Sequence, residues 1–249
     1  MLAHTIQNET SYNIQHVLNA QSSGGAQISA PMILTAALIF TLYCILMAFL
    51  TTATMPLLLI FGIQIIIFLA TITLLACIIF IENPQLLKKM FVGSFSSHTW
   101  IAIAINILIG LSSFIAIPYV HLIFAMSFRL IATMTNNKIN VIISKTKNHN
   151  SIPYFFNIFV ATPIIEECFF RGILQSFLKK YFHAHFAAII HSIIFAIMHL
   201  SILYPLVVNI PIFCTIFSLS IFFSILYETT GSLIPSIMLH VMYNIFCYL

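Results

Sequence analysis

Residues 57–81 read LLLIFGIQIIIFLATITLLACIIFI, and this stretch decides the fold class. It is predominantly apolar on every side, and none of its residues carries a charge. At about 1.5 Å per residue, a helix of this length exceeds the ~30 Å hydrocarbon core of a bilayer. A chain in lipid must pair its own backbone groups, which leaves helices or closed barrels, and barrel strands alternate polar and apolar residues. The stretch therefore predicts a transmembrane helix.

The remainder of the chain has the same composition. Of 249 residues, 61% are hydrophobic and 6% are charged, whereas a soluble domain has about 25% charged residues. No Asp, Glu, Lys or Arg occurs between Glu9 and Glu82. We predict an all-α integral membrane protein, a polytopic transmembrane helix bundle of about seven to eight spans.

Prolines, glycines and lysines separate the predicted helices. Residues 1–29 are polar and are expected to form a flexible arm, followed by a transmembrane domain at 30–249. Lys88 and Lys89 are expected in a short loop, and residues 129–152 form the longest polar connection. Helices are expected at residues 30–51, 56–81, 100–128 with a kink or break at Pro118, 153–178, 183–204, 205–227 and 231–249.

The basic residues argue against one class of partner. The formal net charge is +4, but no basic cluster is denser than Lys145 and Lys147. A nucleic-acid-binding protein would carry a basic patch or stripe. Lys and Arg in the loops of a membrane protein ordinarily face the headgroups. We therefore expect contact with membrane lipid and no nucleic-acid partner.

Two adjacent glutamates, Glu166 and Glu167, lie near the middle of the predicted helix at 153–178. An ionisable group at that depth costs about 2.5–3.5 kcal/mol on insertion scales and marks a functional site by default. Glu167 and Arg171 are four residues apart and can pair on one helix face, whereas Glu166 is turned away from Arg171. We expect Glu166 to keep a free carboxylate suited to a general base. The alternative is a structural Glu–Arg lock between helices.

Two later helices carry further polar groups. Phe195 and His199 are one turn apart, and His240 and Asn244 project together at i, i+4. Taken alone, His199 could be a hydrogen-bonded packing residue, and the His240–Asn244 pair could hold helices together. His191 lies two turns before His199 and is a candidate supporting residue.

Glu166, His199, His240 and Asn244 are expected near the middles of three predicted helices, and therefore at comparable depth. A carboxylate, two imidazoles and a carboxamide can activate water. Glu166 would take the proton, and the His and Asn groups would hold a metal or stabilise an oxyanion.

These residues resemble the CAAX-protease and bacteriocin-processing family of intramembrane proteases, also called the Abi or CPBP family. The family signature is the three motifs EExxxR, FxxxH and HxxxN/D. The resemblance covers residues 153–249, and residues 1–152 share only hydrophobic helices with the family. The motifs stand here as Glu166-Glu167-x-x-x-Arg171, Phe195-x-x-x-His199 and His240-x-x-x-Asn244.

The resemblance implies a membrane-embedded endopeptidase that cleaves near a prenylated C-terminus or in a small peptide precursor. Glu166 would activate water, and His199 would help to bind that water or a metal. His240 and Asn244 would stabilise the oxyanion or complete a metal site. Glu167 would complete the catalytic set and, with Arg171, support its geometry; Arg171 and Phe195 would be the supporting residues.

Zinc or another divalent metal is a candidate cofactor, although the chain has no HExxH sequence. Its ligands would be Glu166, His199, His240 and Asn244. The alternative to a protease is a non-catalytic membrane protein. It would be an immunity or scaffold protein, or a transporter with a buried Glu–His relay.

Overall fold

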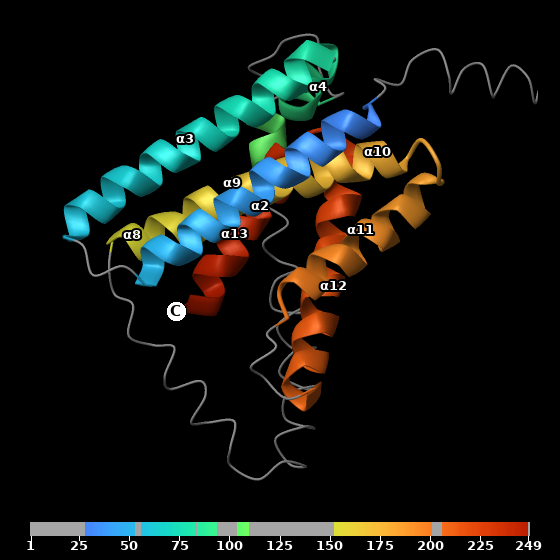
Figure 1. Ribbon diagram of the computed structural model, residues 1–249. Helices are drawn as coiled ribbons and strands as arrows, with labels where there is room; N and C mark the ends of the chain where they lie inside the picture. Colours follow the sequence, from blue (N-terminus) through green and yellow to red (C-terminus); the bar gives the residue numbers. More distant parts are fainter. Residues whose placement is uncertain are drawn as a thin grey trace, which may run out of the picture.

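The computed structural model describes residues 28–52, 56–82, 84–93, 104–109, 152–200 and 206–248. Across these ranges the regular structure is helical and no strand is formed, which confirms the all-α fold class (Figure 1). The expected arm at 1–29 lies outside these ranges except for Ile28 and Ser29. The expected span at 100–128 also lies outside them, apart from a helical stretch at 104–109.

Helices α2 (Ala30–Thr52) and α3 (Leu57–Glu82) are long, apolar and packed against each other (Figure 1). Although α2 is apolar on all sides, its buried residues form one stripe along the helix, spaced three and four residues apart. This is the spacing of a helix face that packs against a neighbour. The opposite face exposes large aliphatic side chains, which is the surface of a helix that faces lipid. The buried stripe is Met32, Ala36, Phe40, Tyr43, Met47 and Leu50.

Four of the described helices are long and apolar enough to cross a membrane. These segments are Ala30–Leu50, Leu58–Ile81, Ile152–Leu178 and Asn209–Thr230. Two further apolar helices are shorter, α11 (Ala184–Met198) and α13 (Ile234–Tyr248). The predicted number of about seven to eight spans also counted 100–128, most of which is not described.

Helix α4 (Pro84–Val92) forms where we expected a loop around Lys88 and Lys89. Proline is favoured in the first turn of a helix, where its missing N–H costs nothing. Leu86 and Met90, four residues apart, are buried, while Lys88 is exposed. The loop prediction was wrong because this short amphipathic pattern was overlooked.

The helix at Ile152–Leu178, here called the central helix, contacts α2, α3, α11 and α13. Two of its segments have π-helical geometry, which is common at functional sites. The continuous helix confirms the prediction at 153–178. Its segments are α8 (Ile152–Phe156), η2 (Asn157–Ala161), α9 (Thr162–Glu167), η3 (Cys168–Gln175) and α10 (Ser176–Leu178).

The last three helices differ from their predicted bounds at the ends. Helix α11 ends at Met198 instead of continuing to residue 204, so His199 is its C-cap residue and not a mid-helix residue. Helix α12 (Leu206–Thr230) packs against both α11 and α13. Gly231, with φ of 66°, ends α12, since glycine adopts this left-handed conformation without strain.

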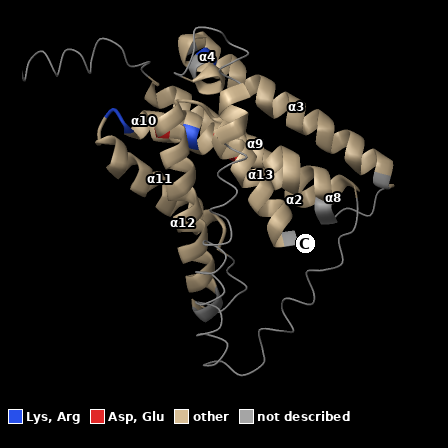
Figure 2. Ribbon diagram, turned by 180° about the vertical axis from the view of Figure 1, so that it is seen from behind, with Lys and Arg blue, Asp and Glu red and all other residues tan. Residues whose placement is uncertain are grey.

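Charged groups gather in few places on the fold. Figure 2 shows Lys and Arg at α4, at the turn after α10 and inside the bundle, with Glu also inside the bundle, while most of each long helix is tan. The exposed Lys88, Lys179 and Lys180 belong to α4 and that turn. Both lie toward the end of the bundle where α2 begins and α3 ends (Figure 1).

Candidate active site

Arg171 and Glu167 form a fully buried pair inside the central helix. Arg171 Nη1 lies 3.0 Å from Glu167 Oε1, and both side chains are 0% exposed. The guanidinium also donates to Ser220 Oγ on α12 at 2.7 Å, and it lies over the rings of Phe195 and Phe223 at 4.6 and 5.2 Å. Carboxylate, hydroxyl and two aromatic faces thus compensate for the lost hydration of the charge. The pairing predicted from four-residue spacing is confirmed.

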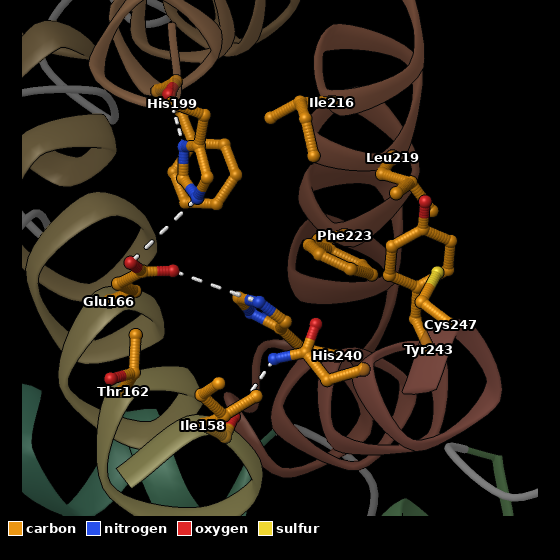
Figure 3. Close-up of a pocket in the computed structure, with 12 residues that line it drawn as sticks. Ile158, Thr162, Glu166, His199, Ile216, Leu219, Phe223, His240, Tyr243 and Cys247 are labelled. Carbon is orange, nitrogen blue, oxygen red and sulfur yellow. Dashed lines mark hydrogen bonds and ion pairs between the residues drawn. The ribbon is translucent and has the colours of Figure 1, made fainter. Parts of the chain in front are cut away.

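Glu166 faces away from this pair and into a cavity of about 360 Å³. The cavity lies between the central helix, the end of α11, α12 and α13 (Figure 3). Its polar side chains include Glu166, His199, His240 and Asn244, so the four candidate residues come together at one cavity. Its apolar wall includes Ile158, Ile216, Leu219 and Phe223.

The hydrogen bonds of His199 define its tautomer. Its Nδ1 lies 2.8 Å from the carbonyl oxygen of Phe195. Because a carbonyl oxygen can only accept, Nδ1 carries the proton, and Nε2 of the neutral ring presents a lone pair. That Nε2 lies 3.9 Å from Glu166 Oε1 (Figure 3). Phe195 therefore supports the site in two ways, by its carbonyl and by its ring under Arg171.

His240 is oriented in the same way by a different partner. Its Nδ1 lies 2.9 Å from Glu167 Oε1, so the carboxylate accepts and Nδ1 carries the proton. In the neutral ring, Nε2 therefore presents a second lone pair, 3.7 Å from Glu166 Oε2 (Figure 3). Glu167 thus joins Arg171 on one side to His240 on the other. The sequence did not indicate this second contact.

Asn244 binds a backbone carbonyl at the edge of the cavity. Its Nδ2 donates to Ile158 O at 2.9 Å. This carbonyl needs a donor because the N–H of Thr162 turns to Asn157 O, in the π-helical register, and Pro163 has no N–H. One N–H of the Asn244 amide is used in this bond, and the second can serve a ligand in the cavity.

The carboxylate of Glu166 lacks a donor where one is needed. Its Oε2 is buried and has no hydrogen-bond partner among the described residues. The two nearest ring nitrogens, Nε2 of His199 and Nε2 of His240, are acceptors in the neutral tautomers described above. Three acceptors that face one another repel unless a proton donor or a cation lies between them. Water, with two protons, is such a donor.

The same atoms can be tested as metal ligands. Carboxylate oxygen and imidazole nitrogen are donors that zinc accepts. In the part of the chain that the structure describes, no group of three or more His, Cys, Asp or Glu side chains lies close enough to hold a metal ion. Asn244, the fourth expected ligand, directs its amide nitrogen to Ile158. The donor chemistry suits a divalent metal, but the side chains as placed do not close around one.

Sequence reasoning missed several residues that surround the site. Ser220 and Ser224 on α12 are four residues apart and contact Arg171 and His191. Thr162 lines the cavity, and Phe223 stacks on His240 with ring centroids 5.0 Å apart. The i, i+4 serines in an apolar helix were a usable signal, because hydroxyls in such helices commonly bond to neighbouring helices.

These features define a class of protein, a helical membrane protein with a buried carboxylate–imidazole site. Residues 148–246 match the family model described as type II CAAX prenyl endopeptidase Rce1-like. The match confirms the resemblance that the three motifs indicated, and its span includes all of them. No curated protein and no solved structure matches the chain. The family supports an intramembrane endopeptidase as the general activity.

Proposed function

We propose that this protein hydrolyses a peptide bond within the membrane, with Glu166 as the general base that activates water. The observation that carries the proposal is the convergence of the Glu166 carboxylate with two ring nitrogens. His199 Nε2 and His240 Nε2 lie 3.9 and 3.7 Å from its oxygens. A water molecule between them would donate one proton to Glu166 and the other to an imidazole. Its oxygen lone pairs would then be free for attack.

In the proposed first step, the water oxygen attacks the peptide carbonyl carbon while Glu166 takes the proton. The carbonyl oxygen becomes an oxyanion, which the second N–H of the Asn244 amide would stabilise. Glu166 then gives its proton to the leaving nitrogen, and the C–N bond breaks. The products are a carboxylic acid and an amine, so atoms and charge balance without a covalent intermediate.

His240 and His199 would orient the water in this scheme. Glu167 holds His240 by its Nδ1–H, an arrangement that fixes ring orientation and makes Nε2 a better acceptor. The Phe195 carbonyl does the same for His199. The two rings would therefore hold the water against Glu166 before the substrate binds, which lowers the entropic cost of attack.

Two observations support the substrate class that we propose, the wall opposite Glu166 and the matched family. Ile216, Leu219 and Phe223 give the cavity an apolar side. A peptide with a hydrophobic group near its cleavage site would place that group on this wall. A prenylated C-terminal peptide is the substrate that we propose, and a small apolar peptide precursor is the second candidate.

The test uses the purified full-length protein in lipid vesicles and a peptide that ends in a CAAX sequence with a farnesylated cysteine. Release of the last three residues is measured by mass spectrometry, with the unmodified peptide in parallel. Glu166→Gln keeps the shape of the side chain but removes the base, and kcat should fall by about 10²–10⁴-fold.

Glu228→Gln is the matched control because it makes the same chemical change outside the cavity, where Glu228 pairs with Lys179 at 2.8 Å. It should cleave at the wild-type rate. Wild-type activity in Glu166→Gln would exclude the general-base role. Cleavage of an unmodified peptide precursor, with no preference for the prenyl group, would favour the second substrate.

A scaffold or transporter is the competing function, and the fully buried Glu167–Arg171–Ser220 contacts are what such a protein would also use. Loss of cleavage in Glu166→Gln, with normal expression and membrane insertion, would exclude a scaffold or transporter.

A divalent metal bound by Glu166, His199 and His240 would supply Lewis-acid chemistry. Metal analysis of wild type and His199→Ala, with activity measured after chelation and zinc addition, tests that proposal.

A further inference from the structure

A chain of buried polar groups runs from α11 through α12 to the cavity. His191 is 0% exposed, and its Nε2 lies 2.6 Å from Ser224 Oγ. Ser224 Oγ donates to the carbonyl oxygen of Ser220 at 3.1 Å. Since the single hydroxyl proton of Ser224 is used there, the bond to His191 requires Nε2–H of His191 as the donor. The direction of both bonds is thereby fixed.

The next link joins Ser220 to the buried guanidinium. Arg171 Nη2 donates to Ser220 Oγ at 2.7 Å and to Ser220 O at 3.3 Å. Ser220 O thus accepts from Ser224 and from Arg171, and its hydroxyl accepts from Arg171 as well. The backbone position of Ser220 and the rotamer of its side chain therefore determine where the Arg171 fork lies.

Arg171 passes this constraint to the cavity. Its other nitrogen, Nη1, holds Glu167 Oε1 at 3.0 Å, and the same oxygen accepts Nδ1–H of His240 at 2.9 Å. If Arg171 shifts, Glu167 Oε1 shifts with it, and the bond that selects the Nδ1–H tautomer of His240 weakens. An Nε2–H tautomer would direct a proton at Glu166 instead of a lone pair.

We propose that His191, Ser224 and Ser220 are positioning residues, which act through Arg171 and Glu167 to hold His240 with its Nε2 lone pair toward Glu166. None of the three lines the cavity in which Glu166 lies. The inference rests on the proposed function for its effect on hydrolysis. The tautomer of His240 is a separate readout that does not require any cleavage.

The experiment compares Ser220→Ala with Ser218→Ala in the full-length protein. Ser218 lies on the same helix, and its hydroxyl donates to the local carbonyl of Cys214 over 2.8 Å. Ser220→Ala should lower kcat by about 10–100-fold with little change in KM, as is typical when a partner behind an active-site group is removed. Ser220→Thr keeps the hydroxyl and should recover activity. Ser218→Ala should behave as wild type.

His191 provides a second pair of variants. His191→Gln keeps an N–H donor in place of the ring Nε2–H and should retain most of the activity, whereas His191→Leu removes the donor and should behave as Ser220→Ala. Both variants remain informative if Ser220→Ala fails to fold. Far-ultraviolet circular dichroism and the unfolding temperature identify such a failure.

The deciding measurement is ¹⁵N NMR of the protein labelled in its histidine rings, with the His240 signals identified by their loss in His240→Gln. Wild type should show a protonated Nδ1 and an unprotonated Nε2. Ser220→Ala and His191→Leu should shift His240 toward a tautomer mixture, and Ser218→Ala should not.

An unchanged His240 tautomer would overturn the inference, whether or not kcat falls, because a fall alone would then reflect general destabilisation. A tautomer change in a protein that cleaves no peptide would support the inference while the proposed function fails. The two failures are therefore distinguishable.

Discussion

Asn244 on the last helix donates its side-chain amide to the carbonyl oxygen of Ile158 in the first π segment of the central helix, over 2.9 Å. The π-helical register and Pro163 together remove the helical donor of this carbonyl. The bond therefore satisfies a buried backbone group with a side chain 86 residues further along the chain. It also fixes the amide at the edge of the cavity, so one side chain serves both packing and the proposed chemistry.

Asn244→Ala should destabilise the protein by about 1–3 kcal/mol, because Ile158 O loses its donor. Pro163→Ala restores a backbone N–H five residues after Ile158, the spacing of a π-helical bond. The penalty of Asn244→Ala should therefore be smaller in the Pro163→Ala background, as a double-mutant cycle by thermal unfolding in detergent would measure. Equal penalties in the two backgrounds would show that Asn244 does not replace the missing helical donor.

Breaking the pair of Glu167 and Arg171 should be far more harmful than breaking the pair of Lys179 and Glu228. Arg171→Met leaves the carboxylate of Glu167 buried without its cation, which costs about 3–5 kcal/mol. Lys179→Met removes a partly exposed pair, for which the cost is about 0–1 kcal/mol. Denaturant unfolding of the two variants in the same detergent measures the contrast. Similar losses would mean that Glu167 finds another partner.

Arg171→Lys separates charge from geometry at the same position. Lysine keeps the positive charge but lacks the planar fork that reaches Glu167 and Ser220 together. We expect Arg171→Lys to be less stable than wild type and to lose activity. Full recovery by lysine would show that a point charge suffices and that the contact to Ser220 is dispensable.

The sequence predicted the parts of the site that depend on local spacing. Four-residue separation was enough to pair Glu167 with Arg171, because the two side chains share a helix face. The length of the apolar stretches was enough to predict four long helices, namely α2, α3, α12 and the central helix. The three motifs were enough to predict that Glu166, His199, His240 and Asn244 lie together, and all four line one cavity.

The remaining features depend on contacts between distant residues, which spacing does not reveal. The partners of Glu167 and Asn244 lie 73 and 86 residues away. The sequence did not indicate the end of α11 at Met198 either, because no proline or glycine occurs between Met198 and Pro205. The two π segments of the central helix, Asn157–Ala161 and Cys168–Gln175, were not predicted either.

Gly93 should tolerate no side chain, whereas Gly62 should. Gly93 ends α4 with φ of 73°, and a Cβ there would lie 2.6 Å from the carbonyl oxygen of Thr230. Gly93→Ala would therefore strain the backbone and push α4 away from the α12–α13 junction. At Gly62, inside α3, a Cβ meets no atom of the described residues within 4 Å, and alanine is more stable than glycine in a helix by about 0.5–1 kcal/mol.

Thermal unfolding of the two alanine variants measures this difference, and the expected shifts have opposite signs. The backbone of α4 is already tied to the junction, since Leu233 N donates to Met90 O and Ser232 Oγ donates to Phe91 O. A normal unfolding temperature in Gly93→Ala would mean that these bonds re-form around a shifted helix end.

His199 and His240 should respond differently to removal, although both face Glu166. The side chain of His199 is 31% exposed and is held by one backbone carbonyl, that of Phe195. The side chain of His240 is 7% exposed, bonds to Glu167 and stacks on Phe223. His199→Ala should therefore abolish most cleavage with little loss of stability. His240→Ala should lose both, because it opens a void and removes a donor from a buried carboxylate.

Two quantities are measured for each variant, kcat/KM on the farnesylated peptide and the unfolding temperature. Both variants should lose at least about tenfold in kcat/KM if each ring orients the water. Only His240→Ala should unfold at a clearly lower temperature. If His199→Ala retained full activity, the water would be held by His240 and Glu166 alone, and the proposed arrangement of two imidazoles around one carboxylate would be wrong.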